Sequence, residues 1–189
     1  MLKFISTSFR ALAVFTLICG VVYPVFVTVV GQLLFPTQAA GSIAKLESGT
    51  PIGSSLLAQK TTSPLYFWPR PSAVDFATVA SGASNLSPTS KVFIDQVNVR
   101  AKSLNSIINN VPADLLTTSA SGIDPHISQE AALFQAARVA LARSVPLIEI
   151  QNLLQSMVVP ADPFFKQNNR KIVNVLELNL ALDRKVKKP

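Results

Sequence analysis

His126, the one histidine of the chain, lies among residues that can do acid–base chemistry. Asp124 stands two positions before it, Ser128 two positions after it, and Ser121 is close by. A serine hydrolase arranges a nucleophile, a base and an orienting acid in space, and residues two apart in one turn do not form that relay by spacing alone. No G-x-S-x-G motif is present. The pattern favours a turn or capping role for His126 and leaves a secreted hydrolase as an alternative.

Metal and nucleotide chemistry find equally little support in the sequence. One histidine and one cysteine, Cys19, do not supply a usual zinc set, and the 10 acidic residues follow no calcium-loop spacing. No G-x-x-x-x-G-K-[S/T] phosphate loop occurs. The Ser81–Asn85 loop is small and flexible enough to hold an anion, as many loops are. We therefore expect no cofactor on this chain and no catalytic activity.

An uncharged run of 25 residues extends from Ala11 to Phe35. As a helix it would be about 37 Å long, and the hydrocarbon core of a bilayer is about 30 Å thick. Gly20, Tyr23 and Pro24 lie inside the run, and such residues indicate a kink whose freed backbone groups face protein. A buried core helix or the core of a cleaved signal peptide would be shorter. The run predicts a retained transmembrane helix.

The charges on either side of this run predict its orientation. Lys3 and Arg10 precede it, and no charge follows it before Lys45. Positive charge on the short side places that side in the cytoplasm. The sequence thus divides into a cytoplasmic tail (1–10), a transmembrane helix (11–35), a linker (36–52) and an extracytoplasmic domain (53–189). A nucleic-acid partner is excluded by this placement.

The net charge of +7 is concentrated at the end of the chain. Four cations crowd the last six residues: Arg184, Lys185, Lys187 and Lys188. They predict either a solvated tail or contact with anionic headgroups or an acidic partner.

The first half of the domain alternates short elements with irregular chain. Residues 54–59 favour a strand, and prolines break the stretch 60–90. Thr89 is typical of a helix N-cap, and apolar spacing predicts a helix from there to about Asn110. Residues 115–119 favour a second strand.

The second half is dominated by helices. Asp124 or Ser128 can cap a helix whose predicted apolar face is Leu133, Ala136, Ala137, Ala140 and Leu141, with Arg138 and Arg143 outside it. Pro146 ends this helix and opens another. Residues 172–175 favour a strand, and Asn174 with Glu177 then resembles a helix-capping pair. Without a regular βαβ rhythm, these elements predict a small α+β domain behind one membrane helix.

Six segments, taken in order, resemble one family along nearly the whole chain. They are Gly20–Pro24, Gly53–Gln59, Tyr66–Ala73, Ser81–Thr89, Ala120–Ser128 and Asn174–Asp183. Together they resemble the KdpC family, the small single-span component of the bacterial Kdp potassium-transporting ATPase. Ala58, Ala83 and Ser87 depart from the family's glycines by small-residue exchanges.

The resemblance implies a membrane complex in which this chain is an accessory subunit. Its partners would be a channel-like potassium-binding subunit and an ATP-hydrolysing P-type subunit, and its domain would lie over the extracytoplasmic ion entrance. The chain has no D-K-T-G phosphorylation motif. The family is also assigned a catalytic-chaperone role that raises the ATP affinity of the pump subunit. Because ATP is cytoplasmic, only coupling through the membrane helices fits the predicted orientation.

The segment from Tyr66 to Thr89 is the expected partner surface, although Phe67 and Trp68 fit a core position equally well. Under the partner interpretation, Trp68→Ala should weaken co-purification without unfolding the domain. The full set of candidate partner contacts is Tyr66, Phe67, Trp68, Arg70, Ser81, Gly82, Ser84, Asn85, Asp124 and His126.

Overall fold

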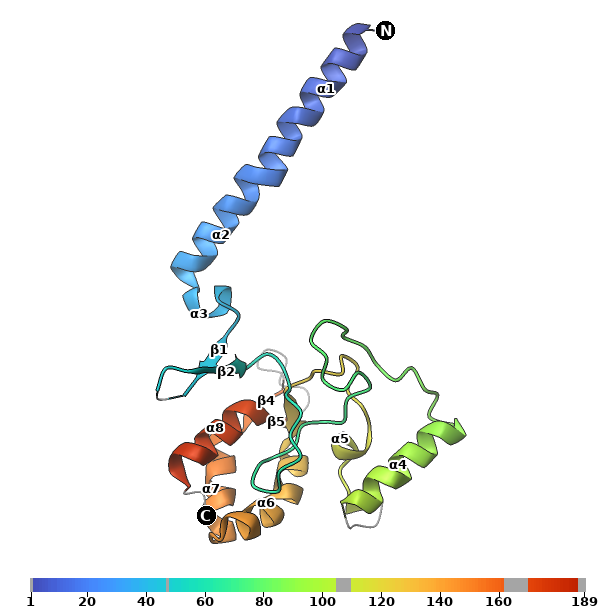
Figure 1. The fold of residues 1–189 in the computed structure, drawn as a ribbon, viewed down its shortest axis with the longest axis vertical. Helices are drawn as coiled ribbons and strands as arrows, with labels where there is room; N and C mark the ends of the chain where they lie inside the picture. The colour runs from blue at the N-terminus through green and yellow to red at the C-terminus, as the bar shows by residue number, and fades with distance from the viewer. Residues whose placement is uncertain (1, 47, 105–109, 162–169, 187–189) are drawn as a thin grey trace.

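A long N-terminal helix projects from a small body of helices and short strands (Figure 1). The computed structural model describes residues 2–46, 48–104, 110–161 and 170–186. Mixed helix and sheet behind one apolar helix is the fold class predicted from the sequence, and the prediction is confirmed.

The projecting helix is continuous but not uniform. It consists of α1 (Leu2–Leu17), the π turn η1 (Ile18–Val22) and α2 (Tyr23–Leu34). Pro24 has no N–H and its ring crowds the preceding turn, and the wider π turn lies directly before it, with the Tyr23 N–H bonded to the Ile18 carbonyl. The stretch from Phe4 to Leu34 is long and apolar enough to cross a membrane, and none of its residues is buried against the described body.

A short helix and a hairpin connect this helix to the body. They are α3 (Pro36–Ala39), β1 (Ile43–Lys45) and β2 (Pro51–Ser54), with β1 and β2 antiparallel. The stretch 36–52, expected to be a linker, therefore contains regular structure. The strand predicted over 54–59 was wrong, because the chain turns after Ser54, whose carbonyl accepts the Leu57 N–H at 3.2 Å.

The body contains a three-stranded antiparallel sheet in the order β3-β5-β4. Its strands are β3 (His126–Ser128), β5 (Lys171–Asn174) and β4 (Val159–Pro160). The predicted strand and helix near the C-terminus are confirmed. The Asn174 side chain accepts the Glu177 N–H at 3.1 Å and starts α8 (Val175–Lys185).

Helices α6 (Gln129–Arg143) and α7 (Leu147–Met157) pack against each other. The Ser128 hydroxyl caps α6 by accepting the Ala131 N–H at 3.1 Å. Ser144 then adopts a left-handed conformation, and Pro146 precedes α7, as predicted. The short connection makes the two helices neighbours.

Two further helices lie on the side of the body away from α8 (Figure 1). Helix α4 (Lys91–Ser103) begins one residue later than predicted, because Ser90 and not Thr89 accepts the Phe93 N–H; residues 105–109, within the predicted helix, lie outside the described residues. Helix α5 (Ala113–Leu116) occupies the start of the strand predicted over 115–119. That prediction was wrong, since Leu115 and Leu116 bury themselves in one helical turn.

The face that α6 buries also differs from the prediction. Leu133 and Leu141 are exposed, Leu141 at 83%. The buried residues of α6 include two polar ones, as the set shows: Ala131, Ala132, Gln135, Ala136, Val139, Ala140 and Arg143. Residues 132, 135, 136, 139, 140 and 143 follow helical spacing. The buried face of α6 therefore follows the helical repeat. Its two polar residues are explained by the segment that packs against them.

Candidate functional site

The aromatic segment Ser63–Trp68, here called the clamped segment, crosses α6 and α8 without pairing to a strand. Two side-chain amides take the place of a neighbouring strand. The Phe67 N–H donates to Asn179 Oδ1 at 2.8 Å, and Asn179 Nδ2 donates back to the Phe67 carbonyl at 2.9 Å. Gln135 does the same for Trp68, accepting its N–H at 2.8 Å and donating to its carbonyl at 3.1 Å.

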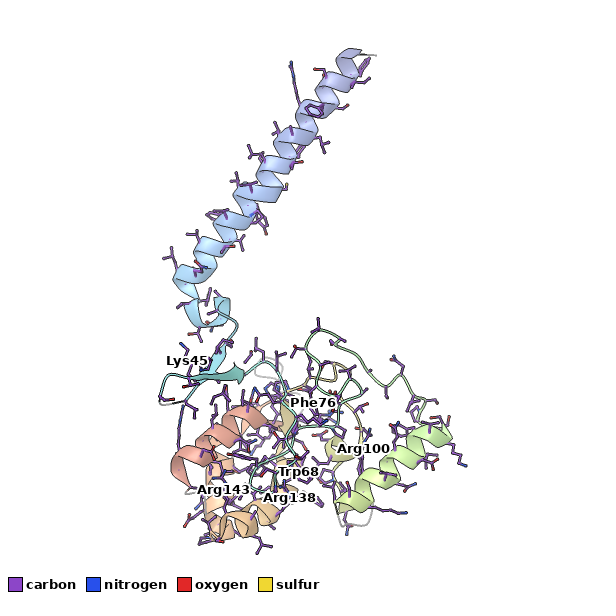
Figure 2. The ribbon with its side chains drawn as sticks, in the orientation of Figure 1. Lys45, Trp68, Phe76, Arg100, Arg138 and Arg143 are labelled. Atoms are coloured by element: carbon purple, nitrogen blue, oxygen red, sulfur yellow. The ribbon has the colours of Figure 1, made fainter. Side chains whose placement is uncertain are left out.

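Arg138 holds the outer side of the clamped segment (Figure 2). Its guanidinium donates to the Pro64 carbonyl at 2.8 Å and the Tyr66 carbonyl at 3.0 Å, and it stacks on the Trp68 ring at 4.0 Å. Burial lowers the pKa of Arg138 to about 10, so the group stays charged at neutral pH and the stacking is a cation–π contact.

Arg143 lies beneath the same segment, with a side chain that is 0% exposed. It donates to the Leu65 carbonyl at 2.9 Å, to the Val186 carbonyl at 3.1 Å and to Asp183 Oδ1 at 2.6 Å. The Tyr66 hydroxyl donates to the other Asp183 oxygen at 3.0 Å. Arg143 thus ties together the clamped segment, α6 and the end of α8.

The loop Ser81–Asn85 rests on residues 121 and 122. The Gly82 N–H and the Ser81 hydroxyl both donate to the Ser121 carbonyl, at 2.9 and 3.0 Å. Gly122 has φ +71, and an added Cβ would lie 2.6 Å from the Val74 side chain and 2.8 Å from the Gly82 carbonyl. Only glycine fits this approach without strain.

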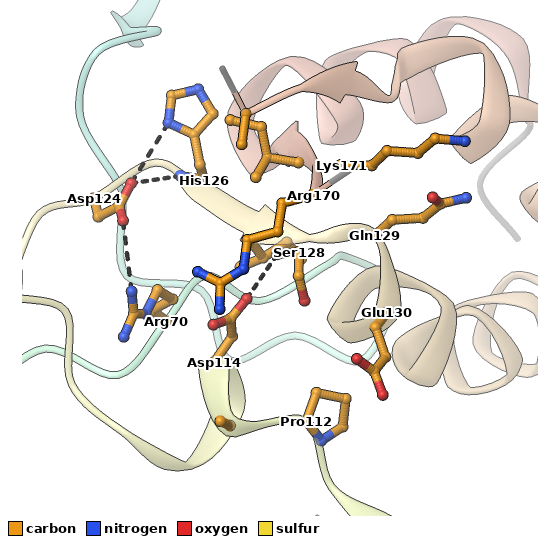
Figure 3. Close-up of a pocket in the computed structure, with 14 residues that line it drawn as sticks. Arg70, Pro112, Asp114, Asp124, His126, Ser128, Gln129, Glu130, Arg170 and Lys171 are labelled. Carbon is orange, nitrogen blue, oxygen red and sulfur yellow. Dashed lines mark hydrogen bonds and ion pairs between the residues drawn. The ribbon is translucent and has the colours of Figure 1, made fainter. Parts of the chain in front are cut away.

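A cleft of about 630 Å³, here called the charged cleft, opens at the edge of the sheet (Figure 3). Its charged and polar lining comes from the loops, α5, β3, β5 and α6: Arg70, Asp114, Asp124, His126, Ser128, Gln129, Glu130, Arg170 and Lys171. Cations and acids are mixed in it. In Figure 3 the Arg170 side chain points into the space beside Arg70 and Asp114.

Asp124 is the electrostatic centre of the charged cleft. Its Oδ1 accepts the His126 backbone N–H at 2.9 Å and lies 3.5 Å from His126 Nδ1. Arg70 Nη1 lies 3.8 Å from Oδ2. The pKa of Asp124 is lowered, chiefly by the hydrogen bond to the His126 side chain, with burial acting in the opposite direction. The carboxylate is therefore charged at neutral pH.

The neighbours of Asp124 are held in place by backbone contacts. Arg70 Nη2 lies 3.3 Å from the Thr118 carbonyl, while its Nε is buried without a hydrogen-bond partner among the described residues. Asp114 accepts the Ser128 N–H at 2.7 Å. Within the described part of the chain, no hydrogen bond joins the His126 side chain to a serine hydroxyl. This geometry suits ionic contact with a partner better than a nucleophile–base relay.

Comparison with known proteins identifies the family. The family model described as "K+-transporting ATPase, c chain" matches residues 5–184. The chain belongs to the KdpC family. Potassium-transporting ATPase KdpC subunits resemble it over nearly their whole length. That of Geotalea uraniireducens is 45% identical over 188 residues, covering 97% of this chain and 98% of the relative. That of Rhodospirillum rubrum is 46% identical over 191 residues, covering 98% and 97%.

In this KdpC-family chain, the candidate contact residues separate into three groups. Arg70, Asp124 and His126, distant in sequence, meet in the charged cleft. Ser81, Gly82, Ser84 and Asn85 form the loop resting on Ser121 and Gly122. Tyr66, Phe67 and Trp68 belong to the clamped segment.

The clamped segment gives its aromatic side chains different surroundings. Phe67 is 0% exposed and belongs to the core, one of the two interpretations open for it. Trp68 is half-buried, and its indole N–H donates to the Ser63 carbonyl at 2.9 Å. Phe67 is therefore unavailable to a partner in this fold, while Tyr66 and Trp68 keep an exposed edge.

Sequence reasoning missed Gln135, Arg138, Arg143 and Asn179, which hold the clamped segment. It also missed Asp114, Arg170 and Lys171 in the charged cleft. The signal for Gln135 and Arg143 was their helical spacing with the alanines of α6. Nothing in the nearby sequence indicates that Asp114 or Lys171 lies close to His126. The sheet and α5 bring these residues together only in the folded chain.

Proposed function

We propose that this chain is a non-catalytic accessory subunit of a potassium-transporting ATPase complex. The apolar helix would anchor it, and the body would lie outside the cytoplasm against a channel-like potassium-binding subunit and an ATP-hydrolysing subunit. The observation that carries the proposal is the family match over residues 5–184 together with one helix able to span a membrane. Potassium and ATP would be handled by the partner subunits, with no cofactor on this chain.

The charged cleft is the surface that we assign to contact with the partner subunits. Asp124 lies 3.8 Å from Arg70 Nη1 and 3.5 Å from His126 Nδ1, both long contacts, and the side chains of Arg70, Asp124 and His126 are 25–40% exposed. Loosely paired, accessible charges favour steering and register with a complementary partner. The charge flanks of the membrane helix favour a body outside the cytoplasm, and the placement near the ion entrance is what the family resemblance implies.

A matched pair of glutamate substitutions tests the cleft. His126→Glu places an acid beside Asp124, and Lys60→Glu places one beside Asp75, with which Lys60 forms an exposed ion pair. We expect His126→Glu to reduce co-purified partner subunits and potassium uptake at low potassium at least about fivefold, and Lys60→Glu to change neither. Normal assembly and uptake in His126→Glu would remove the cleft from the interface.

The orientation is tested separately by cysteine accessibility. In a Cys19→Ser background, Ser42→Cys and Lys188→Cys are treated with a membrane-impermeant thiol reagent from each side of sealed vesicles. We expect both to react from the extracytoplasmic side. Reaction from the cytosolic side alone would overturn the proposed placement, and it would reopen direct action on ATP binding.

A further inference from the structure

The β1–β2 hairpin joins the projecting helix to the body (Figure 1). On the side of the helix, the Ala39 N–H of α3 donates to the Phe35 carbonyl at 2.8 Å. The second strand then closes on the turn that follows α3, because the Ser54 hydroxyl donates to the Gly41 carbonyl at 2.8 Å. The end of the helix, α3 and the hairpin are therefore connected by hydrogen bonds as well as by the chain.

Hydrogen bonds also fasten the end of the hairpin to the body. Asn174 Nδ2 donates to the carbonyl of Ser55, the residue directly after β2, at 2.7 Å. The Ala58 N–H donates to the Ile123 carbonyl at 2.9 Å, and Ala58 is buried. The turn after β2 is thus held to the body at both of its ends.

The side chain of Gln59 braces this turn from outside. Its Nε2 donates to the Ile52 carbonyl of β2 at 2.9 Å, which holds the chain after the turn against the strand. Gly53 leaves the space for the amide, since a Cβ at that position would overlap Gln59 Nε2. A longer contact, 3.4 Å from Arg184 Nη2 to the Lys45 carbonyl, joins β1 to α8. The hairpin therefore contacts the body along both of its strands.

The two attachment points lie next to residues of the charged cleft. Asn174 pairs with His126 across the sheet, and Ile123 directly precedes Asp124. Residues directly opposite in an antiparallel pair have Cα atoms about 4.5–5.5 Å apart. Asn174 has a second role, because its Oδ1 accepts the Glu177 N–H and starts α8. One amide therefore connects the hairpin, α8 and the strand beside the cleft.

We propose that Asn174 and Gln59 are positioning residues, which hold the hairpin against the body and so fix the direction in which the charged cleft faces relative to the membrane helix. Assembly with partner subunits requires the helix and the cleft to be engaged together. A fixed orientation lowers the entropy that a freely swinging body would lose on binding. The inference rests on the proposed function and adds to it the connection that orients the contact surface.

The test removes the two side-chain bonds without removing the cap of α8. Asn174→Asp keeps the oxygen that accepts the Glu177 N–H, and aspartate caps a helix as well as asparagine does. It replaces the donor to the Ser55 carbonyl with a second oxygen, which repels that carbonyl. Gln59→Ala removes the brace on the Ile52 carbonyl.

Spin labels on the helix and on the body measure their relative orientation. In a Cys19→Ser background, the labels are placed on Leu33→Cys near the end of α2 and on Leu141→Cys in α6, both of which are exposed. The full chain is studied in lipid nanodiscs by pulsed electron–electron double resonance. The measured quantity is the distribution of distances between the two labels.

We expect one narrow distribution in the unmodified chain. Asn174→Asp with Gln59→Ala should add a broad component, since each lost hydrogen bond raises the ratio of detached to attached hairpins about fivefold. The control pair is Ser48→Ala, which removes an exposed hydroxyl bond within the hairpin, and Asn152→Asp, which adds the same charge at an exposed position of α7. It should keep the narrow distribution. The Trp68 emission should be the same in all three chains, because the body stays folded.

Gln59→Ala alone, at an exposed side chain, should give a smaller broad component. A broad distribution in the unmodified chain, equal broadening in the control pair, or no broadening in the double variant would overturn the proposed hold on the hairpin. The double variant should also recover fewer partner subunits, and normal co-purification despite a broad distribution would overturn the positioning role. Because the distance measurement needs no partner, a failed hold and a failed proposed function give different results.

Discussion

The clamped segment and the charged cleft use polar side chains in opposite ways. Around the clamped segment, the amides and guanidiniums that hold the backbone make contacts of 2.6–3.1 Å, and Arg143 is fully buried. In the charged cleft Asp114 and Asp124 also accept backbone N–H groups at 2.7 and 2.9 Å. The contacts between side chains are longer, 3.5 Å from Asp124 to His126 and 3.8 Å from Asp124 to Arg70, and these three groups reach solvent. Polar groups satisfied inside the chain stabilise the fold. Polar groups left loosely paired at a concave surface are available to a partner.

The largest expected effect comes from Arg143. Arg143→Met removes a fully buried cation from the Leu65 and Val186 carbonyls and from Asp183 Oδ1. Asp183 is 21% exposed and keeps the Tyr66 hydroxyl, so we expect a loss of about 3 kcal/mol, the lower end of the range for breaking a buried ion pair. Urea unfolding of the full chain in detergent micelles, followed by the fluorescence of Trp68, the sole tryptophan, measures the free energy of unfolding. The control Lys60→Met breaks an exposed pair and should cost less than about 1 kcal/mol. Equal losses of unfolding free energy in Arg143→Met and Lys60→Met would contradict the distinction between the buried polar groups of the clamped segment and exposed ion pairs.

The next largest effect is expected for the two side-chain amides that hold the clamped segment, those of Gln135 and Asn179. Gln135→Leu and Asn179→Leu each leave one N–H and one carbonyl of the clamped segment without partners, at about 2–3 kcal/mol each. The double variant should lose less unfolding free energy than the sum of the two single losses, because the two amides hold adjacent residues. Once one amide is removed and the segment loosens, removing the other breaks weaker bonds. The same unfolding experiment measures all three variants. Strict additivity would show that Phe67 and Trp68 are held independently.

This contrast explains which parts of the fold could be predicted from sequence. The long apolar helix that could span a membrane, the Ser128 and Asn174 caps and the start of α7 after Pro146 depend on local sequence, and all are confirmed. The buried face of α6 was predicted wrongly because Gln135 and Arg143 bond to a segment 67 and 78 residues away. An inward-facing polar residue cannot be recognised before its distant partner is known.

The charged cleft could also be predicted from the sequence only in part. The motif around His126 drew attention to Asp124, and their contact is local. Arg70 reaches the same carboxylate only because the loop after the clamped segment passes beside β3. The candidate contacts included three members of the cleft without indicating that they form one site, since nothing in their spacing along the sequence joins them.

Gly122, which the Ser81–Asn85 loop approaches closely, should show an intermediate effect. Gly122→Ala places a Cβ in a left-handed conformation, which costs about 1–2 kcal/mol, and in addition brings that Cβ to 2.6 Å from the Val74 side chain and 2.8 Å from the Gly82 carbonyl. We expect this second, steric cost in Gly122→Ala alone. The strain is local, so the Trp68 emission of the folded state should not change, while proteolysis should begin near Ser81–Asn85. Gly49→Ala is the control, because its φ is also positive, at +82, but nothing lies within 4 Å of its added Cβ. Equal costs for the two variants would mean that the loop contact contributes nothing.

The smallest expected effect is the pH response of Asp124. Its pKa is lowered in the folded chain, so its contribution to stability is present above the unfolded value of 3.8 and is lost as pH falls through the folded pKa. His126→Ala removes the largest cause, the side-chain hydrogen bond, but keeps the backbone N–H bond. The pKa of Asp124 should therefore rise part of the way back, while Arg70→Met, which removes a smaller cause, should raise it less. Carboxyl carbon chemical shifts over an acid titration measure both changes. The reverse order would make Arg70, and not His126, the partner that holds this carboxylate ionised, and would move the centre of the proposed contact surface toward the loop.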